Sequence, residues 1–236
     1  MKVPQHVSII PDGNRRFAKQ LMQKPWKGHE WGSDKIENVF EWSRELGIKV
    51  LTFYTLSLEN LDSRPKKELN FLFRIAKRFM RDILNNPDSF IHKSRVRVRC
   101  FGQLDKLPQD IQEDIAALEA ATKEYSDYYV NLAIAYGGRQ ELVEACQAIG
   151  QKIAAGTLSP HEIDETILRH NLSTNGHPDP DLIIRTGGEK RLSNFLLYQS
   201  AYSELEFLST LWPELTKEEF TKVVRKFGKR ERRFGK

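Results

Sequence analysis

Arginines, glycines and hydroxyl side chains gather directly after three short hydrophobic runs of this chain. The clusters are Pro11–Arg16, then Ser57–Asn60 with Arg64, and finally Arg185–Glu189 with Arg191 and Ser193. Guanidinium groups bind phosphate oxygens in pairs, and glycine-rich turns offer backbone N–H groups to the same oxygens. The combination predicts a site for phosphorylated ligands, with more arginines than one phosphate group needs.

Each cluster alone has a simpler interpretation. The Asp-Gly-Asn sequence at 12–14 is typical of a turn, and the Thr-Gly-Gly sequence at 186–188 is typical of a helix start. Asp12 is either a salt-bridge partner of the arginines or a ligand of Mg²⁺ shared with phosphate oxygens, and the many cations favour the second interpretation. The sequence contains neither GxxxxGK[ST] nor GxGxxG, which argues against a P-loop NTPase and a Rossmann dehydrogenase.

The elements that must position these clusters follow from the hydrophobic periodicity. Strands are predicted at Val7–Ile10, Val50–Tyr54, Val96–Phe101, Tyr129–Ala135, Leu182–Ile184 and Glu206–Leu208. A helix is predicted between the first two strands, where Ile36, Val39, Phe40 and Ser43 have helical spacing before a stop at Gly47. Further helices are predicted at Glu68–Leu84, Gly138–Gln151 and Ser159–His170, the last with Ser159 as N-cap and Pro160 as first residue. A helix between two strands implies that the strands are parallel.

We therefore predict one α/β domain over residues 1–236, with a mostly parallel sheet of about six strands flanked by helices. In such sheets ligands bind beyond the carboxyl ends of the strands, which is where the three polar clusters lie. The Glu68–Leu84 helix is apolar on more than one side. It is either packed on two sides or forms the wall of an apolar ligand cavity.

Composition excludes several classes of protein. Hydrophobic residues make up 39% of the 236 residues, and the mean hydropathy of -0.55 argues against an integral membrane protein. No apolar stretch resembles a signal peptide, so we expect a cytoplasmic protein. Cys100 and Cys146 lack the spacing of a zinc site and are expected to be reduced thiols.

The net charge of +5 is concentrated at the C-terminus. Residues 217–236 hold 9 basic and 3 acidic side chains, which leaves 28 basic and 29 acidic residues in the rest of the chain. This basic segment suits a phosphate ligand or an anionic membrane surface. Nucleic acid is not expected as a partner, because the alternating cations at 93–99 are typical of a solvated strand face.

Five ordered motifs resemble the cis-prenyltransferases, typified by undecaprenyl diphosphate synthase. They are HVSIIPDGNRRFAK, FYTLSLENLDSRP, AYGGRQELVEA, DLIIRTGGEKRLSNFLLYQSAYSELEF and RERRFG, and they cover nearly the whole chain. The resemblance implies a homodimer in which isopentenyl diphosphate is condensed with an allylic diphosphate to give a medium- or long-chain Z-polyprenyl diphosphate, a precursor of lipid carriers. It also implies a hydrophobic tunnel beside the sheet, lined by the Glu68–Leu84 helix, for the growing chain.

The resemblance further assigns roles to individual residues. Asp12 is implied to be catalytic and to bind Mg²⁺ together with Glu204, and Asn60 is implied to accept a proton. Residues implied to bind the allylic diphosphate or to border it are Gly13, Asn14, Arg15, Arg16, Phe17 and His29. The segment after the second strand contributes Ser57, Leu58, Glu59 and Leu61. Those implied to bind isopentenyl diphosphate are Arg64, Arg185, Arg191, Leu192 and Ser193, and the terminal motif with Arg233 and Gly235 is implied to reach the partner subunit's active site.

Some positions depart from the family pattern. Arg15 stands where many members have glycine, Pro25 where an arginine is common, and Leu61 where tryptophan is usual, in a segment one residue longer than the bacterial form. These changes border the allylic site, so we expect a different primer choice or coupling geometry, with Arg15 or Lys24 supplying the charge lost at Pro25. The alternative, a non-catalytic subunit of a prenyltransferase complex, is disfavoured because such subunits lose the catalytic aspartate or the arginine motif.

Overall fold

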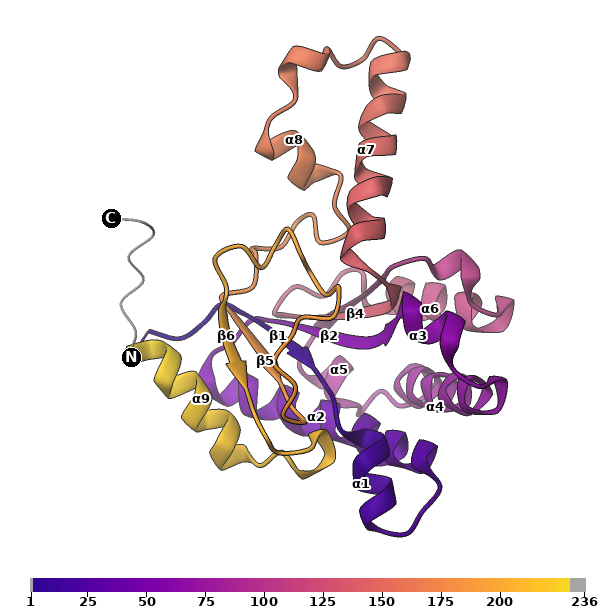
Figure 1. Cartoon of the computed structure of the whole chain (residues 1–236), viewed down its shortest axis with the longest axis vertical. Coiled ribbons are helices and arrows are strands. Elements are labelled where there is room, and N and C mark those ends of the chain that lie inside the picture. The colour runs from indigo at the N-terminus through magenta and orange to yellow at the C-terminus, as the bar shows by residue number, and fades with distance from the viewer. Residues whose placement is uncertain (1, 230–236) are drawn as a thin grey trace.

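The computed structural model describes residues 2–229 and is built on one six-stranded sheet (Figure 1). The strands are β1 His6–Ile10, β2 Val50–Ser57, β3 Val96–Phe101, β4 Tyr128–Tyr136, β5 Leu182–Arg185 and β6 Glu204–Phe207. They lie in the order β3-β4-β2-β1-β5-β6, and every paired neighbour is parallel. The predicted α/β class with a parallel sheet is confirmed.

Helices lie in each connection from β1 to β5, whereas residues 186–203 join β5 to β6 without a helix. The helices are α1 Asn14–Gln20, α2 Gly28–Leu46, α3 Leu58–Ser63, α4 Lys66–Asn85, α5 Phe90–Lys93, α6 Gln109–Thr122, α7 Gly138–Ala154, α8 Glu165–His170 and α9 Lys217–Lys229. Short 3₁₀ turns occur at η1 Pro25–Lys27, η2 Leu104–Lys106, η3 Pro160–Glu162 and η4 Trp212–Glu214. As predicted, α2 ends at Gly47, whose φ of 84° suits glycine. Figure 1 shows α7 and α8 projecting from the body as an arm.

The two faces of the sheet differ in character. One face carries the main hydrophobic core, in which strand residues such as Ile9 and Phe53 pack with buried side chains of α2, α4, α6 and α9. The other face holds a smaller cluster around Tyr54, Tyr136 and Phe195. Because the strands are parallel, their carboxyl ends, and the loops that follow them, lie at one edge of the sheet.

Two sequence predictions about elements need correction. Residues 159–170 form two short helices rather than one, because Ser159 and Glu162 close a capping box around a single turn and Asp164, in extended backbone, caps a new helix at Ile167 N. The last strand begins at Glu204, two residues before its predicted start, because Glu204 pairs with Leu182 of β5. Cys100 and Cys146 are both free, as predicted. No helix among the described residues is long and apolar enough to cross a membrane.

Candidate active site

The carboxyl ends of β1, β2 and β5 open into one polar cavity of about 870 Å³. Side chains from all three predicted clusters line it, as expected from strands that are neighbours in the sheet. The lining residues that the sequence predicted are Asp12, Gly13, Asn14, Arg15, Arg16, His29, Ser57, Glu59, Asn60, Arg64, Arg185, Arg191 and Ser193. Most of the cations among them come from different segments, so only folding brings them together.

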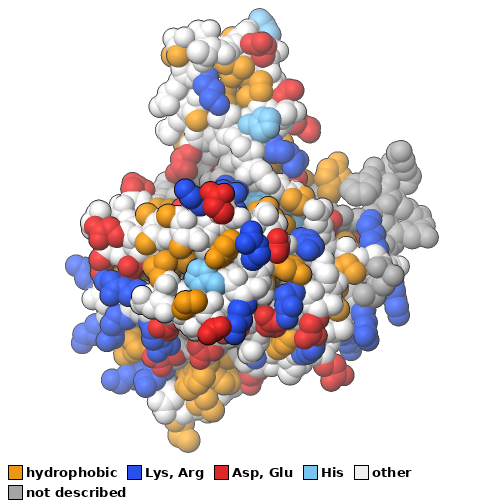
Figure 2. Space-filling view, turned by 180° about the vertical axis from the view of Figure 1, so that it is seen from behind, with side chains coloured by type: hydrophobic (Ala, Val, Ile, Leu, Met, Phe, Trp, Pro, Cys, Tyr) orange, Lys and Arg blue, Asp and Glu red, His pale blue; other side chains and the backbone are white. Residues whose placement is uncertain are grey.

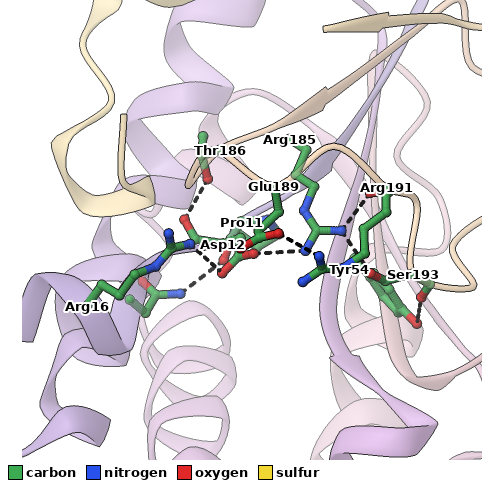
Figure 3. Close-up of polar contacts among 10 residues, drawn as sticks. Pro11, Asp12, Arg16, Tyr54, Arg185, Thr186, Glu189, Arg191 and Ser193 are labelled. Carbon is green, nitrogen blue, oxygen red and sulfur yellow. Dashed lines mark hydrogen bonds and ion pairs between the residues drawn. The ribbon is translucent and has the colours of Figure 1, made fainter. Parts of the chain in front are cut away.

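Arg185 links the end of β1 to the loop after β5 (Figure 3). Its guanidinium donates through Nη2 to Asp12 Oδ2 at 2.8 Å, and through Nη1 to Arg191 O at 2.6 Å and Ser193 Oγ at 2.8 Å. The Arg185 side chain is 6% exposed, whereas that of Asp12 is 32% exposed on the cavity wall. Arg16 Nη2 lies 3.4 Å from the other Asp12 oxygen. The Asp12 carboxylate is thus held between two guanidinium groups and still reaches the cavity.

A magnesium ion held chiefly by diphosphate oxygens needs only one or two protein carboxylates, and Asp12 fits that demand through its cavity exposure and acceptor oxygens. Residues 2–229 contain no group of three or more His, Cys, Asp or Glu side chains able to hold a metal by themselves. Glu204, the second predicted ligand, lies at the amino end of β6 opposite Leu182, whereas Arg185 marks the carboxyl end of β5. Within one chain, Glu204 is therefore not part of the cavity wall formed by the described residues.

The Thr-Gly-Gly segment does not start a helix, which corrects the simpler interpretation of this motif. Gly187 and Gly188 have φ of 83° and 80°, and their N–H groups donate to Thr210 O and Leu208 O, both at 2.7 Å. A Cβ atom at Gly187 would lie 2.5 Å from Arg16 Nη2 and 3.1 Å from the Asp12 backbone. The glycine therefore allows the β5 loop to approach the Asp12 turn closely.

A buried carboxylate that sequence reasoning missed contacts three residues of the cavity wall. The Glu68 side chain of α4 is 3% exposed, and its Oε1 lies 3.3 Å from Arg64 Nη1, 3.6 Å from His29 Nε2 and 3.9 Å from Arg15 Nε. Its pKa is lowered by His29 and the two arginines. Burial lowers the pKa of His29, although Glu68 acts in the opposite direction, so the ring is neutral at neutral pH. Glu68 therefore collects three basic side chains from three segments at one point.

The segment after β2 is fixed by two polar contacts. Ser57 caps α3 by accepting a hydrogen bond from Asn60 N at 3.1 Å. Glu59 Oε1 accepts one from Asn194 Nδ2 at 2.7 Å, which connects α3 to the loop after β5. These contacts hold Asn60 on the cavity wall.

An apolar cavity of about 150 Å³ adjoins the polar one. It lies between the sheet and α2 and α4, and both cavities are lined by Pro11, Asn14, His29 and Thr55. The α4 side chains that line it are Leu72, Phe73, Ile75, Ala76, Phe79 and Met80. The wide apolar surface of this helix therefore serves both the core and a cavity wall.

Comparisons with known proteins identify the family. A prenyltransferase family model, described as undecaprenyl diphosphate synthase, matches residues 10–235. The chain belongs to the cis-prenyltransferase family. A tritrans,polycis-undecaprenyl-diphosphate synthase (geranylgeranyl-diphosphate specific) of Methanopyrus kandleri is 49% identical over 235 residues, covering 100% of this chain and 86% of the relative. An enzyme of the same description from Pyrococcus horikoshii is 45% identical, covering 99% and 88%.

Solved cis-prenyltransferase structures have the same fold. Lavandulyl diphosphate synthase from Lavandula x intermedia, in complex with dimethylallyl diphosphate, matches with a TM-score of 0.93 at 35% identity over 99% of both chains. A probable undecaprenyl diphosphate synthase from Campylobacter jejuni matches with a TM-score of 0.81 at 35% identity over 100% of both chains. The resemblance seen in the sequence motifs is confirmed.

Several residues implied by the cis-prenyltransferase motifs do not line the polar cavity. Leu58 is buried in the main core, Leu61 packs against that core, and Leu192 packs on the smaller cluster. Phe17 makes an edge contact with Trp31 at 5.4 Å between ring centres. Their substrate-binding roles stay predictions. Those of Arg233 and Gly235 fall outside the described residues.

The cavity wall also contains residues that the sequence reasoning passed over. These are Ile10, Lys19, Tyr54, Thr55 and Asn194. Tyr54 donates from its hydroxyl to Ser193 O at 3.2 Å, and Asn194 follows Ser193 directly. Glu68 carried no sequence signal, because Arg64 is extended at the end of α3 and Glu68 lies in the first turn of α4, so their ion pair is not one of helical spacing.

Proposed function

We propose that this protein condenses isopentenyl diphosphate with geranylgeranyl diphosphate, and repeats the step to make a tritrans,polycis-polyprenyl diphosphate. The observation that carries the proposal is the polar cavity with its five arginines, which shares four wall residues with an apolar cavity. A diphosphate head with a prenyl tail needs both environments side by side. The primer is taken from the geranylgeranyl specificity named for the relatives.

The shared wall residues suggest where each substrate binds. Asn14 and His29 line both cavities, so we assign the allylic diphosphate to their side, near Gly13 and Arg16, with its tail in the apolar cavity. The basic residues at the β5 end are then left for isopentenyl diphosphate. That second group comprises Arg64, Arg185, Arg191 and Ser193.

In the reaction, the allylic C–O bond breaks and diphosphate leaves with the electron pair. The cations on the allylic side stabilise the charge that develops on this leaving group, which is the main way this cavity can lower the barrier. The terminal double bond of isopentenyl diphosphate attacks the allylic carbon, a C–C bond forms and one proton is lost. We assign Asn60 as the first acceptor of that proton, with the departing diphosphate as the stronger base beyond it.

Magnesium is the proposed cofactor. When bound, it neutralises charge on the diphosphate oxygens. Asp12 would hold it within this chain, and Arg185 keeps the Asp12 side chain at the cavity wall for that purpose. Glu204 can join only from a second subunit, given its place at the amino end of β6.

We also propose a homodimer that acts in the cytoplasm at a membrane surface. The arm of α7 and α8 offers exposed apolar side chains for such an interface, with Val143 56% exposed and Ile163 45% exposed. A dimer would also allow the terminal residues Arg233 and Gly235 to reach the partner's cavity, as the family motif implies. Analytical ultracentrifugation of the full chain tests this: a dimer is expected, and a monomer at micromolar concentration would contradict it.

The structure favours Arg15 over Lys24 as the replacement for the arginine missing at Pro25. Arg15 lines the polar cavity, whereas Lys24 lies over the ring of Trp26, with Nζ 5.6 Å from its centre, and is not among the residues lining that cavity. We propose that this shift of charge contributes to the primer preference. Arg15→Gly should raise the KM for the allylic primer about tenfold, whereas Lys24→Gly should leave it within about twofold.

Kinetics with dimethylallyl, geranyl, farnesyl and geranylgeranyl diphosphates test the primer assignment. We expect the highest kcat/KM with geranylgeranyl diphosphate. A strict preference for farnesyl diphosphate would refute the primer assignment while leaving the reaction class intact. Absence of product with every primer would instead favour the non-catalytic subunit.

A further inference from the structure

A cationic segment lies next to the mouth of the site. Residues 14–28, here called the α1–η1 tip, comprise α1, the loop after it and η1, and they form the lower end of the molecule in Figure 1. The tip contains five basic residues and no acidic one. They are Arg15, Arg16, Lys19, Lys24 and Lys27. Lys24 and Lys27 do not line the polar cavity, so a role in holding substrate does not account for them.

Large apolar side chains are exposed on the same tip. Met22 is 95% exposed, Leu21 is 47% exposed, and Trp31 on the adjoining turn of α2 is 37% exposed. Figure 2 shows hydrophobic side chains gathered at this end of the molecule, with Lys and Arg side chains close by. Trp26, within the tip, is only partly buried. Apolar and cationic side chains thus share one protruding surface.

The backbone at Met22 makes the exposed methionine unusual. Helix α1 ends in a Schellman motif, in which Gln23 N–H donates to Ala18 O at 2.9 Å and Met22 N–H donates to Lys19 O at 3.0 Å. Met22 therefore has a φ of 52°, a conformation that glycine or asparagine adopts more easily. The positive φ disfavours methionine, and the exposed side chain contributes nothing to the core. An apolar partner outside the protein would explain a methionine at this position.

We propose that the α1–η1 tip docks on an anionic lipid bilayer. Leu21 and Met22 would enter the headgroup region, Trp26 and Trp31 would lie at the interface, and the tip lysines would bind lipid phosphates. This combination of apolar side chains, tryptophan and cations, in a segment without acidic residues, fits a lipid surface better than a protein surface. The inference rests on the membrane contact included in the proposed function and specifies the surface that makes it, and such binding needs no turnover.

Docking by this tip also has a consequence for the product. Asn14, the first residue of α1, and His29, the second residue of α2, line both cavities. A bilayer bound at the tip therefore lies next to the mouth through which a prenyl chain would leave. An insoluble product could then pass into lipid without crossing water.

Co-sedimentation of the full chain with vesicles tests the proposal. Vesicles of equal parts phosphatidylglycerol and phosphatidylcholine should bind the protein, and vesicles of phosphatidylcholine alone should bind it much more weakly. Met22→Asn suits the backbone and should lower binding about tenfold, and Lys24→Gln should lower it about fivefold. The matched control is Arg225→Gln on the exposed face of α9, which should change binding by less than about twofold.

Two results would overturn the proposal. One is that the tip variants bind like the wild type while Arg225→Gln loses binding, which would move the membrane contact to α9. The other is that Met22→Asn abolishes self-association in analytical ultracentrifugation, which would make the tip a contact between copies of the chain. Vesicle binding is measured without substrate, so failure of the enzymatic proposal would leave this test unaffected.

Discussion

Replacing Arg185 by lysine keeps the charge at the end of β5 and removes the geometry that distinguishes this residue. The guanidinium makes three hydrogen bonds, to Asp12 Oδ2, Arg191 O and Ser193 Oγ, from two different nitrogens. A lysine has one nitrogen on a flexible stem and cannot reach both Asp12 and the loop after β5. At least one charge-assisted hydrogen bond is therefore lost.

The expected cost follows from those contacts. A hydrogen bond to a charged group contributes about 1.5–3 kcal/mol, and a partner left unsatisfied in this buried place adds to the loss, so Arg185→Lys should lower the free energy of unfolding by about 2–4 kcal/mol. For a chain of this length the midpoint of thermal unfolding should fall by roughly 5–15 °C. Turnover should fall about 100-fold, because Asp12 loses the partner that orients it.

Arg191→Lys is the matched control. The Arg191 side chain is 60% exposed, and in the described ion pair its Nη1 lies 2.5 Å from Glu189 Oε2. Because exposed ion pairs contribute little, the free energy of unfolding should change by less than about 1 kcal/mol. Instead, the KM for isopentenyl diphosphate should rise about tenfold, because lysine cannot bind a phosphate bidentately. Thermal melts and steady-state kinetics measure both variants. If Arg185→Lys kept the wild-type melting temperature and turnover, the positioning role of Arg185 would be refuted.

Three further predictions concern the carboxylates and one buried histidine. Asp12→Asn should cut turnover about 1000-fold while circular dichroism still reports the native fold, and wild-type turnover would exclude a catalytic role. Glu68→Gln should lower the free energy of unfolding by about 2 kcal/mol in urea titrations, because Arg64 loses its buried partner. The control Glu59→Gln, at a more exposed carboxylate, should lower it by less than about 1 kcal/mol. Equal losses in the two variants would contradict the role of Glu68. Burial lowers the pKa of His6 to about 4, so the folded chain binds fewer protons than the unfolded chain below pH 6.5, and stability should fall by roughly 3 kcal/mol as pH drops through that window. His6→Gln should flatten this slope in urea titrations at several pH values, and an unchanged slope would count against the assignment.

The strands β1, β2, β4 and β5 were predictable from sequence, because burial on both faces leaves nearly continuous apolar runs. The position of the site followed from the same step, since polar residues after parallel strands meet at one edge of the sheet. The 159–170 segment was not predictable in the same way. There a capping box around Pro160–Glu162 and an N-cap at Asp164 divide the segment into two short helices. The apolar periodicity of the segment does not reveal such a break.

The roles of residues whose contacts depend on tertiary packing could not be predicted from the sequence. Gly187 reads as part of a helix start, but its positive φ serves the close approach of the β5 loop to the Asp12 turn. Glu68 reads as a surface charge on an apolar helix, whereas α1, α2 and the Arg64 segment enclose it. Both residues shape the cavity through contacts with segments distant in the chain.

We propose that the cationic cavity catalyses cis-prenyl condensation. Incubation of the purified protein with Mg²⁺, geranylgeranyl diphosphate and labelled isopentenyl diphosphate, followed by butanol extraction, mass spectrometry and NMR of the product, tests it most directly. We predict a series of polyprenyl diphosphates that differ by one isoprene unit and whose added double bonds are Z. Absence of extractable product, or added double bonds of E geometry, would contradict this catalytic role.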